Sequence, residues 1–397
     1  MSNLLPKSFR FAGVQCGIKP GTEKLDLALI VSELPAAAAG VYTQNRVFAA
    51  PVAWDRARTP GENFRAVVIN SGNANACTGE RGLRDAAETA RLVSRAIGAL
   101  PDQVLVMSTG VIGRFLPMDA LAAGIDDASQ VLADSDDSLL LAAMAIMTTD
   151  TVPKRTSRSA VINGTETTVC GICKGAAMIG PNMATMLALV MTDATVDFAA
   201  LQAMLREVVD ETFNCISVDG HVSTNDTVLL LANGASGGPI LAGNDLAEFR
   251  DLLQETCAEL ACMIPADGEG ATHLMEIEVT GCKTRDAARQ IARCVADSPL
   301  VKTAIHGADP NWGRIVSAAG YAGIEFDPEG VDLDLNGFPL YRSGAPVEFN
   351  APTVSKSIRD HRKTNILLRF REGNASIRFW SADLTAEYVH LNADYTT

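Results

Sequence analysis

Short apolar runs and longer amphipathic stretches alternate along the first two thirds of the chain. Residues 66–69 and 104–107 are apolar runs that end in polar, glycine-containing turns, which is typical of buried β-strands. Between them, apolar residues recur at helical spacing over residues 83–100, so we expect an amphipathic helix there. Residues 197–213 and 245–263 predict further helices, each with acidic residues in its first turn, where they suit the helix dipole. The pattern predicts an α/β fold.

The pattern changes after about residue 275, where strand-like stretches become more frequent. Asn336-Gly337 and Glu372-Gly373-Asn374 predict hairpin turns. Apolar residues alternate with polar ones on both sides of the second turn, at Ile366, Leu368, Phe370, Ile377 and Phe379. A chain of 397 residues also exceeds what one hydrophobic core usually serves. We therefore expect a larger α/β domain over residues 1–275 and a smaller α/β domain over residues 276–397.

Composition and charge narrow the classes of partner. With 47% hydrophobic residues, the chain has enough apolar side chains to bury a core, so intrinsic disorder is not expected. A net charge of −14 argues against nucleic acid and against an anionic membrane surface, because both require a basic face. The N-terminal sequence lacks the organisation of a signal peptide, and no apolar run approaches the roughly 18 residues of a membrane helix. We expect a soluble, cytoplasmic protein.

Nine cysteines are scattered from Cys16 to Cys294, which in a long chain indicates small buried hydrophobes and not a disulfide framework. Cys170 and Cys173 have the C-x-x-C spacing of redox and zinc sites. No second pair and no histidine at matching spacing completes a zinc site, and the pair closes a Thr/Val-rich run where a redox pair would open a helix. We interpret both as structural thiols and expect no metal.

The common cofactor and hydrolase signatures are missing from the sequence. The turn Gly268-Glu269-Gly270 is followed at the sixth position by His273 and not by glycine. No glycine-rich turn ends in G-K-[ST], and neither H-E-x-x-H nor G-x-S-x-G occurs. What remains is a set of Gly/Thr/Asn-rich turns, each of which taken singly is more often a turn than a site. They cover residues 70–75, 108–113, 148–151 and 174–185.

The last of these turns leads into an apolar run over residues 183–191 that predicts a buried strand. Ala184, a small residue, and Thr185, which carries a hydroxyl group, stand at the mouth of this run. A small residue followed by a hydroxyl residue is the composition that self-cleavage of a chain requires. The residues alone leave this open beside the plain interpretation as a turn before a strand.

Six separated motifs of the chain occur together in a characteristic order. They are Ser108–Gly113, Lys174-Gly175, Asn182–Leu187, Asp267–Thr272, Gly307–Arg314 and Asn392–Thr397. In these motifs the chain resembles the ornithine acetyltransferase family of arginine biosynthesis, and the similarity runs from end to end. The resemblance implies a layered α-β-β-α catalytic domain, with a smaller C-terminal domain whose tail returns to the active site.

The resemblance also implies that the chain makes its own nucleophile. The Thr185 hydroxyl would attack the Ala184 carbonyl, and water would hydrolyse the resulting ester to give chains 1–184 and 185–397. The new α-amino group of Thr185, with an ordinary pKa of about 7.7–8.0, would then act as an internal base for its own hydroxyl. Such a nucleophile needs no histidine, which agrees with the lack of a plausible triad.

Further site residues follow from the same resemblance. Thr109 and Gly110 would form the oxyanion hole, since a hydroxyl and a backbone N–H on a tight turn are suitable donors. The substrate-binding positions would be Thr148, Lys174, Thr185, Glu269, Asn392 and Thr397. Lys174 suits a substrate carboxylate and Glu269 a substrate ammonium group, which are the charges of every amino acid.

The implied reaction is a ping-pong acetyl transfer. N-acetylornithine would acetylate Thr185, ornithine would leave, and glutamate would accept the acetyl group to give N-acetylglutamate. The family needs no cofactor for this and suggests an assembly with two copies of each fragment. The sequence leaves open whether acetyl-CoA is a second donor. It also leaves two alternatives, a self-processing aminopeptidase or amidase and an uncleaved amino-acid-binding protein.

Three positions depart from the family pattern. His273 stands where the pattern has lysine, His221 replaces an acidic residue, and Gly175-Ala176-Ala177 differs from the usual residues after the lysine. None of these changes the proposed nucleophile or oxyanion hole. Both histidines flank predicted site turns, so a changed preference for acyl donor or acceptor is one interpretation, and for His273 an ordinary surface residue is the other.

Overall fold

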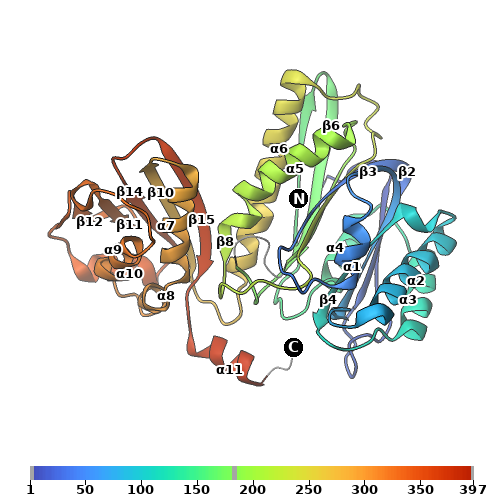
Figure 1. Cartoon of the computed structure of the whole chain (residues 1–397), viewed down its shortest axis with the longest axis horizontal. Helices are drawn as coiled ribbons and strands as arrows, with labels where there is room; N and C mark the ends of the chain where they lie inside the picture. Colours follow the sequence, from blue (N-terminus) through green and yellow to red (C-terminus); the bar gives the residue numbers. More distant parts are fainter. Residues whose placement is uncertain (1–3, 181–185, 395–397) are drawn as a thin grey trace.

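The computed structural model describes residues 4–180 and 186–394, which build two β-sheets with helices packed against each (Figure 1). The first sheet has the strand order β4-β3-β2-β9-β7-β6-β5, with β1 paired to β2. Its strands are β1 (Phe9–Val14), β2 (Leu27–Tyr42), β3 (Gly61–Asn73), β4 (Val104–Val111), β5 (Lys154–Ile162), β6 (Thr165–Lys174), β7 (Leu187–Thr192) and β9 (Thr227–Ala232). The strands β7 and β9 therefore lie between β2 and β6.

The long strand β2 joins two halves of this sheet. Its first part pairs with β1 and β3, its register then shifts after Val31, and its last part pairs with β9. Ile69 and Leu105 from one half belong to the same buried cluster as Leu189 and Leu229 from the other half. The two halves consequently face each other across a shared apolar core, which also takes in α4 (Asp136–Ala145).

Helices cover the outer faces of both halves. The helix α2 (Gly79–Ile97) packs its apolar face on β3 and β4, and α3 (Met118–Gln130) packs on β1 and β2. The helix α1 (Ala50–Arg56) lies beside α2 and β4. On the opposite side, α5 (Phe198–Glu211) packs chiefly on β2 and α6 (Gly243–Ala266) packs on β5 and β6. The order of layers is helix, sheet, sheet, helix, so the predicted α/β fold with α-β-β-α layers is confirmed.

Local sequence explains where these elements begin and which face they bury. Val68 and Val106 point toward the outer helices, whereas their neighbours Ile69 and Leu105 point into the core between the halves, as the period of two in a strand requires. The predicted helix over residues 197–213 is α5, which begins after Asp197, because the Asp197 carboxylate accepts hydrogen bonds from two free N–H groups of the first turn. The predicted helix over 245–263 is α6.

The second sheet has the strand order β13-β12-β11-β14-β10-β15-β8. Its strands are β8 (Ile216–Ser217), β10 (Leu274–Cys282), β11 (Asp332–Leu335), β12 (Phe338–Arg342), β13 (Ala345–Pro346), β14 (Lys363–Arg369) and β15 (Ala375–Ala382). The helices that follow β10 in the chain are α7 (Arg285–Asp297), α8 (Pro299–His306), α9 (Trp312–Gly320) and α10 (Ala351–Arg359). Apart from β8, the sheet uses strands from residue 274 onward, while the boundary near residue 275 stays a prediction.

One of the two predicted hairpins is wrong. Asn336 and Gly337, both with positive φ, do form the turn between the paired strands β11 and β12. The strands on either side of Glu372-Gly373-Asn374 are β14 and β15, and these do not pair with each other, because β10 lies between them. Alternation of apolar residues identified both strands correctly, but it carries no information about which strand becomes the neighbour.

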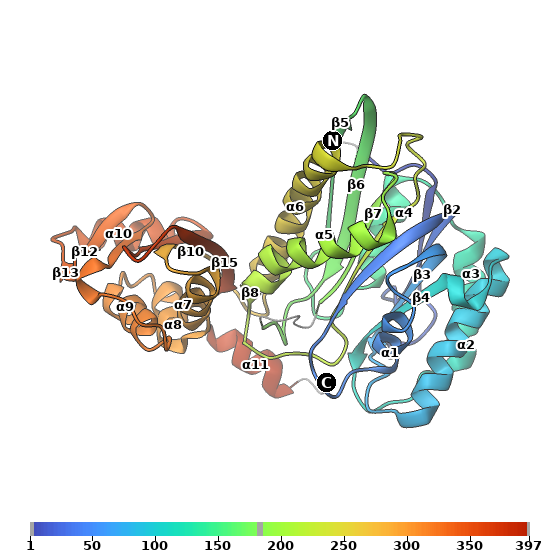
Figure 2. The same cartoon turned by 45° about the horizontal axis from the view of Figure 1, so that its top comes forward.

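The last described helix, α11 (Ala386–Asp394), leaves the second sheet after β15 and extends toward the first, as both Figure 1 and Figure 2 show. It is not part of either sheet's helical layer. Within the part of the chain that the structure describes, no helix combines the length and apolarity needed to cross a membrane. Among the same residues, no three His, Cys, Asp or Glu side chains are grouped as metal ligands.

Candidate active site

A cavity of about 410 Å³ gathers residues from distant parts of the chain. Six of the predicted site residues line it, namely Thr109, Gly110, Thr148, Lys174, Glu269 and Asn392. The lining also includes Thr149, Ala177, Met178, Asp219, His221 and Tyr388. Ala184, Thr185 and Thr397 lie outside the described residues. The structure thus brings together every predicted site residue that it describes, while the role of each stays a prediction.

Thr109 and Gly110 stand at the end of β4, where it runs parallel to β3. Gly110 has φ +130° and pairs with Gly72. A β-carbon added at Gly110 would lie 2.3 Å from the carbonyl carbon of Gly72 and 2.5 Å from the amide nitrogen of Asn73. Only glycine fits this backbone and this close approach. The turn is therefore fixed by the neighbouring strand, which suits a group that must donate a hydrogen bond in one direction.

A buried charge network that the sequence analysis missed lies next to the residues that line the cavity. Lys154 Nζ donates to Asp150 Oδ1 at 2.7 Å and to Asp267 Oδ2 at 2.6 Å, and its side chain is 1% exposed. Asp150 also accepts hydrogen bonds from the amides of Gly175 and Thr148. The network ties the loop that carries Thr148 to the end of β6, which carries Lys174. The two carboxylates belong to motifs that the sequence singled out, but Lys154 had no signal of its own.

Lys174 differs from Lys154 in having no fixed partner. Its side chain is buried, yet no described residue accepts a hydrogen bond from its ammonium group. Burial lowers the pKa of Lys174, against the opposing effect of Asp150. For Asp150, burial would raise the pKa, but Lys174 and Lys154 outweigh it and hold the pKa at about 2. A buried ammonium without a hydrogen-bonded carboxylate is poised to receive an anionic group of a ligand.

Replacing Lys154 with methionine should destabilise the protein by about 3–5 kcal/mol, because Asp150 and Asp267 would lose their buried counter-charge. Chemical unfolding monitored by circular dichroism measures this as a lower midpoint. The matched control is Lys363→Met, which removes a half-exposed ion pair with Glu276 and should change stability by about 1 kcal/mol or less. Equal midpoints for the two variants would contradict the structural role of Lys154.

The negatively charged side chains of the cavity come from the second half of the chain. Asn392 Nδ2, on α11, donates to Glu269 Oε2 at 2.8 Å. Tyr388, one turn earlier, donates its hydroxyl hydrogen to Asp219 Oδ2 at 3.3 Å, and Asp219 in turn accepts from the amide of Met178 at 2.7 Å. The cavity thus contains one ammonium group and two carboxylates. Asp219 and Tyr388 were not predicted, although Asp219 lies in the segment that contains His221.

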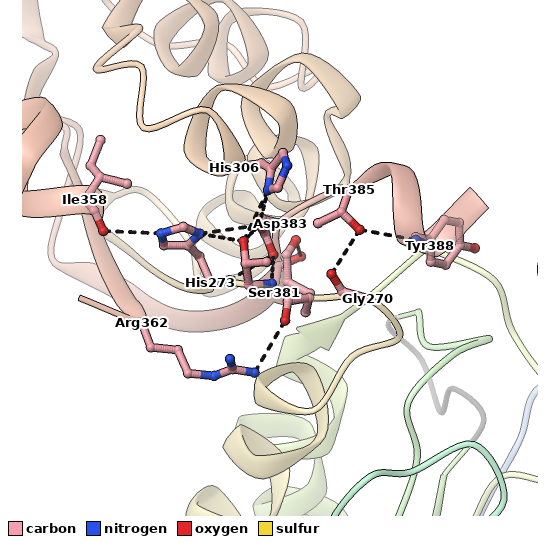
Figure 3. Close-up of polar contacts among 12 residues, drawn as sticks. Gly270, His273, His306, Ile358, Arg362, Ser381, Asp383, Thr385 and Tyr388 are labelled. Atoms are coloured by element: carbon pink, nitrogen blue, oxygen red, sulfur yellow. Dashed lines mark hydrogen bonds and ion pairs between the residues drawn. The ribbon is translucent and has the colours of Figure 1, made fainter. Parts of the chain in front are cut away.

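The base of α11 is held by a polar cluster around Asp383 (Figure 3). Asp383 accepts hydrogen bonds from the amide and the hydroxyl of Thr272, at 2.8 and 2.5 Å, and from the amide of His273 at 3.0 Å. Burial would raise the pKa of Asp383, but the hydrogen bonds from His273 and Thr272 outweigh it and hold the pKa at about 2. Thr385 then donates to the carbonyl of Gly270 at 2.9 Å. The cluster therefore fixes α11 against the loop that carries Glu269.

The two histidines that depart from the family pattern have different surroundings in the structure. His221 lines the cavity. His273 does not line it; its side chain is 11% exposed, its Nδ1 lies 3.4 Å from Asp383, and its Nε2 lies 3.2 Å from the carbonyl oxygen of Ile358 (Figure 3). His273 is thus part of the support of α11, and neither a cavity residue nor a free surface residue. Of these two histidines, His221 is the one whose difference from the family pattern changes the lining of the cavity.

Asp226 is a second buried carboxyl that sequence reasoning missed. It is fully buried, and its Oδ1 accepts a hydrogen bond from the amide of Met186 at 3.2 Å. Burial raises its pKa well above the ordinary value despite hydrogen bonds from neighbours such as Ser223. Its Oδ2 has no hydrogen-bond partner among the described residues. Asp226 therefore places a buried carboxyl group with a raised pKa beside the residue that directly follows Thr185.

The C-x-x-C pair agrees with its interpretation as structural thiols. Cys170 belongs to the core between the two halves of the first sheet, whereas Cys173 faces the α6 side. Burial raises the pKa of both thiols to about 12. Because the strand β6 directs the two sulfur atoms to opposite faces, they do not form a joint site.

Comparison with known proteins decides the family. The family model described as the ArgJ family matches residues 10–397. The chain belongs to the ArgJ family. Two arginine biosynthesis bifunctional proteins ArgJ are similar over nearly their whole length. The one from Rhodopirellula baltica is 45% identical over 100% of this chain and 97% of its own, and the one from Symbiobacterium thermophilum is 48% identical over 99% and 98%.

A solved structure of the ArgJ family agrees with the fold. The arginine biosynthesis bifunctional protein ArgJ from Bacillus halodurans has a TM-score of 0.51 and 40% sequence identity, and the match covers 52% of this chain and 98% of the solved chain. The solved chain is thus about half as long as this one. Membership of the ArgJ family confirms the family predicted from the six motifs, and with it an acyltransferase of arginine biosynthesis.

Proposed function

We propose that this member of the ArgJ family cuts itself between Ala184 and Thr185 and transfers the acetyl group of N2-acetyl-L-ornithine to L-glutamate through acetyl-Thr185. The observation that carries the proposal is the cavity itself. It joins the Thr109-Gly110 turn, the carboxylate of Glu269 and the ammonium of Lys174, which has no hydrogen-bond acceptor among the described residues. Such a set matches an amino-acid substrate that undergoes acyl transfer.

The chemistry of the cut follows from the residue types. The Thr185 oxygen forms a bond to the Ala184 carbonyl carbon, the bond from that carbon to the Thr185 nitrogen breaks, and the hydroxyl proton ends on the nitrogen. Water then hydrolyses the ester and leaves a free amino group on Thr185. Asp226, whose Oδ1 already accepts from the next amide in the chain, is placed to orient the start of β7 during this step.

The transfer reaction uses the same nucleophile twice. The α-amino group of Thr185 takes the hydroxyl proton as the oxygen attacks the acetyl carbonyl of N-acetylornithine, and ornithine leaves with that proton. Thr109 and Gly110 would stabilise the oxyanion of each tetrahedral intermediate. Glutamate then attacks acetyl-Thr185 and carries the acetyl group away. Lys174 would bind the carboxylate that both amino acids share, and Glu269 with Asn392 would meet the amine of ornithine.

The proposal includes the second donor and the assembly. The relatives are named bifunctional, which supports acetyl-CoA as a further source of the acetyl group for Thr185. We further propose a cytoplasmic enzyme with two copies of each fragment, 1–184 and 185–397. The solved Bacillus halodurans chain, matched over 98% of its length yet spanning 52% of this one, supports separate fragments.

Intact mass, N-terminal sequencing and a product assay test the proposal on the purified full-length gene product. The expected result is two fragments, one beginning Thr-Met-Leu-Ala, and conversion of N-acetylornithine and glutamate into ornithine and N-acetylglutamate. Release of acetate in place of N-acetylglutamate would identify a hydrolase of the aminopeptidase or amidase kind. A chain that stays whole and inactive on incubation would leave an amino-acid-binding protein.

Replacing Lys174 with glutamine should raise the KM for N-acetylornithine by about tenfold or more and change kcat less, because a charge-assisted hydrogen bond to the substrate carboxylate is lost. Because burial lowers the pKa of Lys174, the wild-type kcat/KM should decline on the alkaline side below the ordinary lysine range, as the ammonium loses its proton. Steady-state kinetics from pH 6 to 10 measures both. A KM close to that of the wild type in the glutamine variant would remove Lys174 from substrate binding.

A further inference from the structure

A second cavity, of about 620 Å³, is lined by residues of β2, of α1 and of α5, which packs on β2. Three arginines line it, namely Arg46, Arg56 and Arg206, together with the aromatic rings of Tyr42 and Phe48. No aspartate or glutamate is in this lining, although the whole chain contains 47 acidic and 33 basic residues. We call it the arginine pocket. A pocket lined by positive charge attracts anions, even in a protein whose net charge is negative.

Two of the three guanidinium groups have no partner among the residues that the structure describes. Arg46 and Arg206 make no hydrogen bond or ion pair with any residue that the structure describes. Arg56 is held in place, since it donates to the Thr43 carbonyl at 2.8 Å and lies over the rings of Tyr42 and Phe48, 5.6 and 4.8 Å from their centres. In contrast, Glu207 and Glu211 of α5 are both paired with Arg250 of α6. The pocket thus keeps its positive charge available.

The floor of the arginine pocket is rigid. The buried side chain of Gln202 accepts from the amide of Gly40 and donates to its carbonyl, both at 3.0 Å. The hydroxyl of Tyr42 is hydrogen-bonded to the hydroxyl of Thr59 at 2.5 Å. Phe48 is 43% exposed, so part of its ring is open to a flat group of a ligand. A fixed polar floor with an aromatic wall and cationic rim suits a phosphorylated ligand that carries a ring.

Hydrogen bonds join the segment that lines the arginine pocket to the segment that carries His221 of the active-site cavity. Asn45 of the arginine pocket donates to the carbonyl of Val222 at 3.3 Å, and the neighbouring His221 lines the active-site cavity. Thr43 likewise donates its hydroxyl hydrogen to the Ser223 carbonyl at 2.8 Å. By the length of the chain between them, the two cavities are on the order of 10 Å apart. A ligand with a flexible arm is long enough to occupy both.

We propose that the arginine pocket binds the phosphate groups of a coenzyme A thioester whose acyl end reaches the active-site cavity. The inference rests on the proposed function, because acyl transfer to Thr185 is what gives the thioester a use there. Three guanidinium groups match several phosphate charges, whereas the single Lys174 matches the one carboxylate of an amino acid. The active-site cavity thereby receives the acetyl group of both donors, while the arginine pocket binds only the thioester.

Calorimetric titration of coenzyme A into the cleaved enzyme tests the inference without turnover. The double variant Arg46→Glu/Arg206→Glu should weaken coenzyme A binding by about a hundredfold, and Arg206→Gln alone by about tenfold, since each lost phosphate contact is worth roughly a factor of ten. Pantetheine, which has the arm but no phosphate, should bind the variants and the wild type equally. Arg84→Glu, a charge reversal on the exposed face of α2, should change nothing.

Each result of the titration either supports or overturns the proposed binding of coenzyme A in the arginine pocket. Coenzyme A that does not bind, or that binds all variants equally, overturns the inference. Inorganic pyrophosphate that binds as tightly as coenzyme A and with the same dependence on Arg206 overturns the link to an acyl donor, because free phosphate would then be the ligand. Transfer from N-acetylornithine to glutamate is measured in the same samples. Its absence from the wild type, with coenzyme A still bound, would refute the proposed function and not the pocket.

Discussion

Replacing Thr185 with alanine leaves one uncut chain and removes acetyl transfer from both donors. The variant lacks the hydroxyl that attacks the Ala184 carbonyl, and without the cut there is no free α-amino group to act as a base. Denaturing electrophoresis with intact mass detects the uncut chain, and production of N-acetylglutamate measures transfer. Loss of a covalent nucleophile typically lowers kcat by several orders of magnitude, about 10⁴ or more.

Thr185→Ser is the matched control for this variant. Serine keeps a hydroxyl at the same position, so we expect slower but complete cutting and measurable transfer. Transfer at the wild-type rate by Thr185→Ala would refute the covalent mechanism. An uncut but active Thr185→Ala protein would further show that the α-amino group is not the base.

Replacing Thr109 with valine should lower kcat by about 10²–10³ and leave the KM for N-acetylornithine nearly unchanged. Valine has the shape of threonine without the hydroxyl hydrogen, so the variant removes one donor to the developing oxyanion and preserves the ground-state contacts. Thr109 is 3% exposed at the end of β4, where a change in shape would disturb the sheet. Steady-state kinetics with N-acetylornithine and glutamate measures both constants.

The neighbouring Thr149 provides the control for Thr109. Thr149 lines the same cavity and has no predicted role, so Thr149→Val should retain kcat within a few-fold. If both valine variants lower kcat equally, the effect belongs to the polarity of the cavity. If Thr109→Val raises KM and not kcat, Thr109 binds substrate and the oxyanion hole lies elsewhere.

Many of the residues around the cavity could be predicted from the sequence. The apolar run over residues 66–69 predicted a buried strand, and β3 buries Val68 and Ile69 in two different cores. The positions taken from the motifs, such as Thr109, Lys174 and Asn392, come from separate elements and line one cavity. They could be found because each lies in a motif of the family that the chain resembles; taken singly, each of these turns is more often a turn than a site.

Contacts between distant residues could not be found in this way. Lys154 joins Asp267 across 113 positions, and a lone lysine in a strand has the same sequence signature whether it is buried or exposed. Asp226 gives no sign in its local sequence that its carboxyl is buried without an ion-pair partner. The insertion of β10 between β14 and β15 likewise depends on packing between elements, since strand patterns specify a face but not a neighbour.

The order β2-β9-β7-β6 in the first sheet has a practical consequence for producing the enzyme. The proposed cut assigns β2 and β6 to one fragment and β7 and β9 to the other, so each piece alone lacks the strands that satisfy its backbone hydrogen bonds. Separate expression of the two coding segments should give insoluble protein. Co-expression, or a single gene that is cut after folding, is then the route to material for crystallisation, and the cut itself serves as a reporter of correct folding.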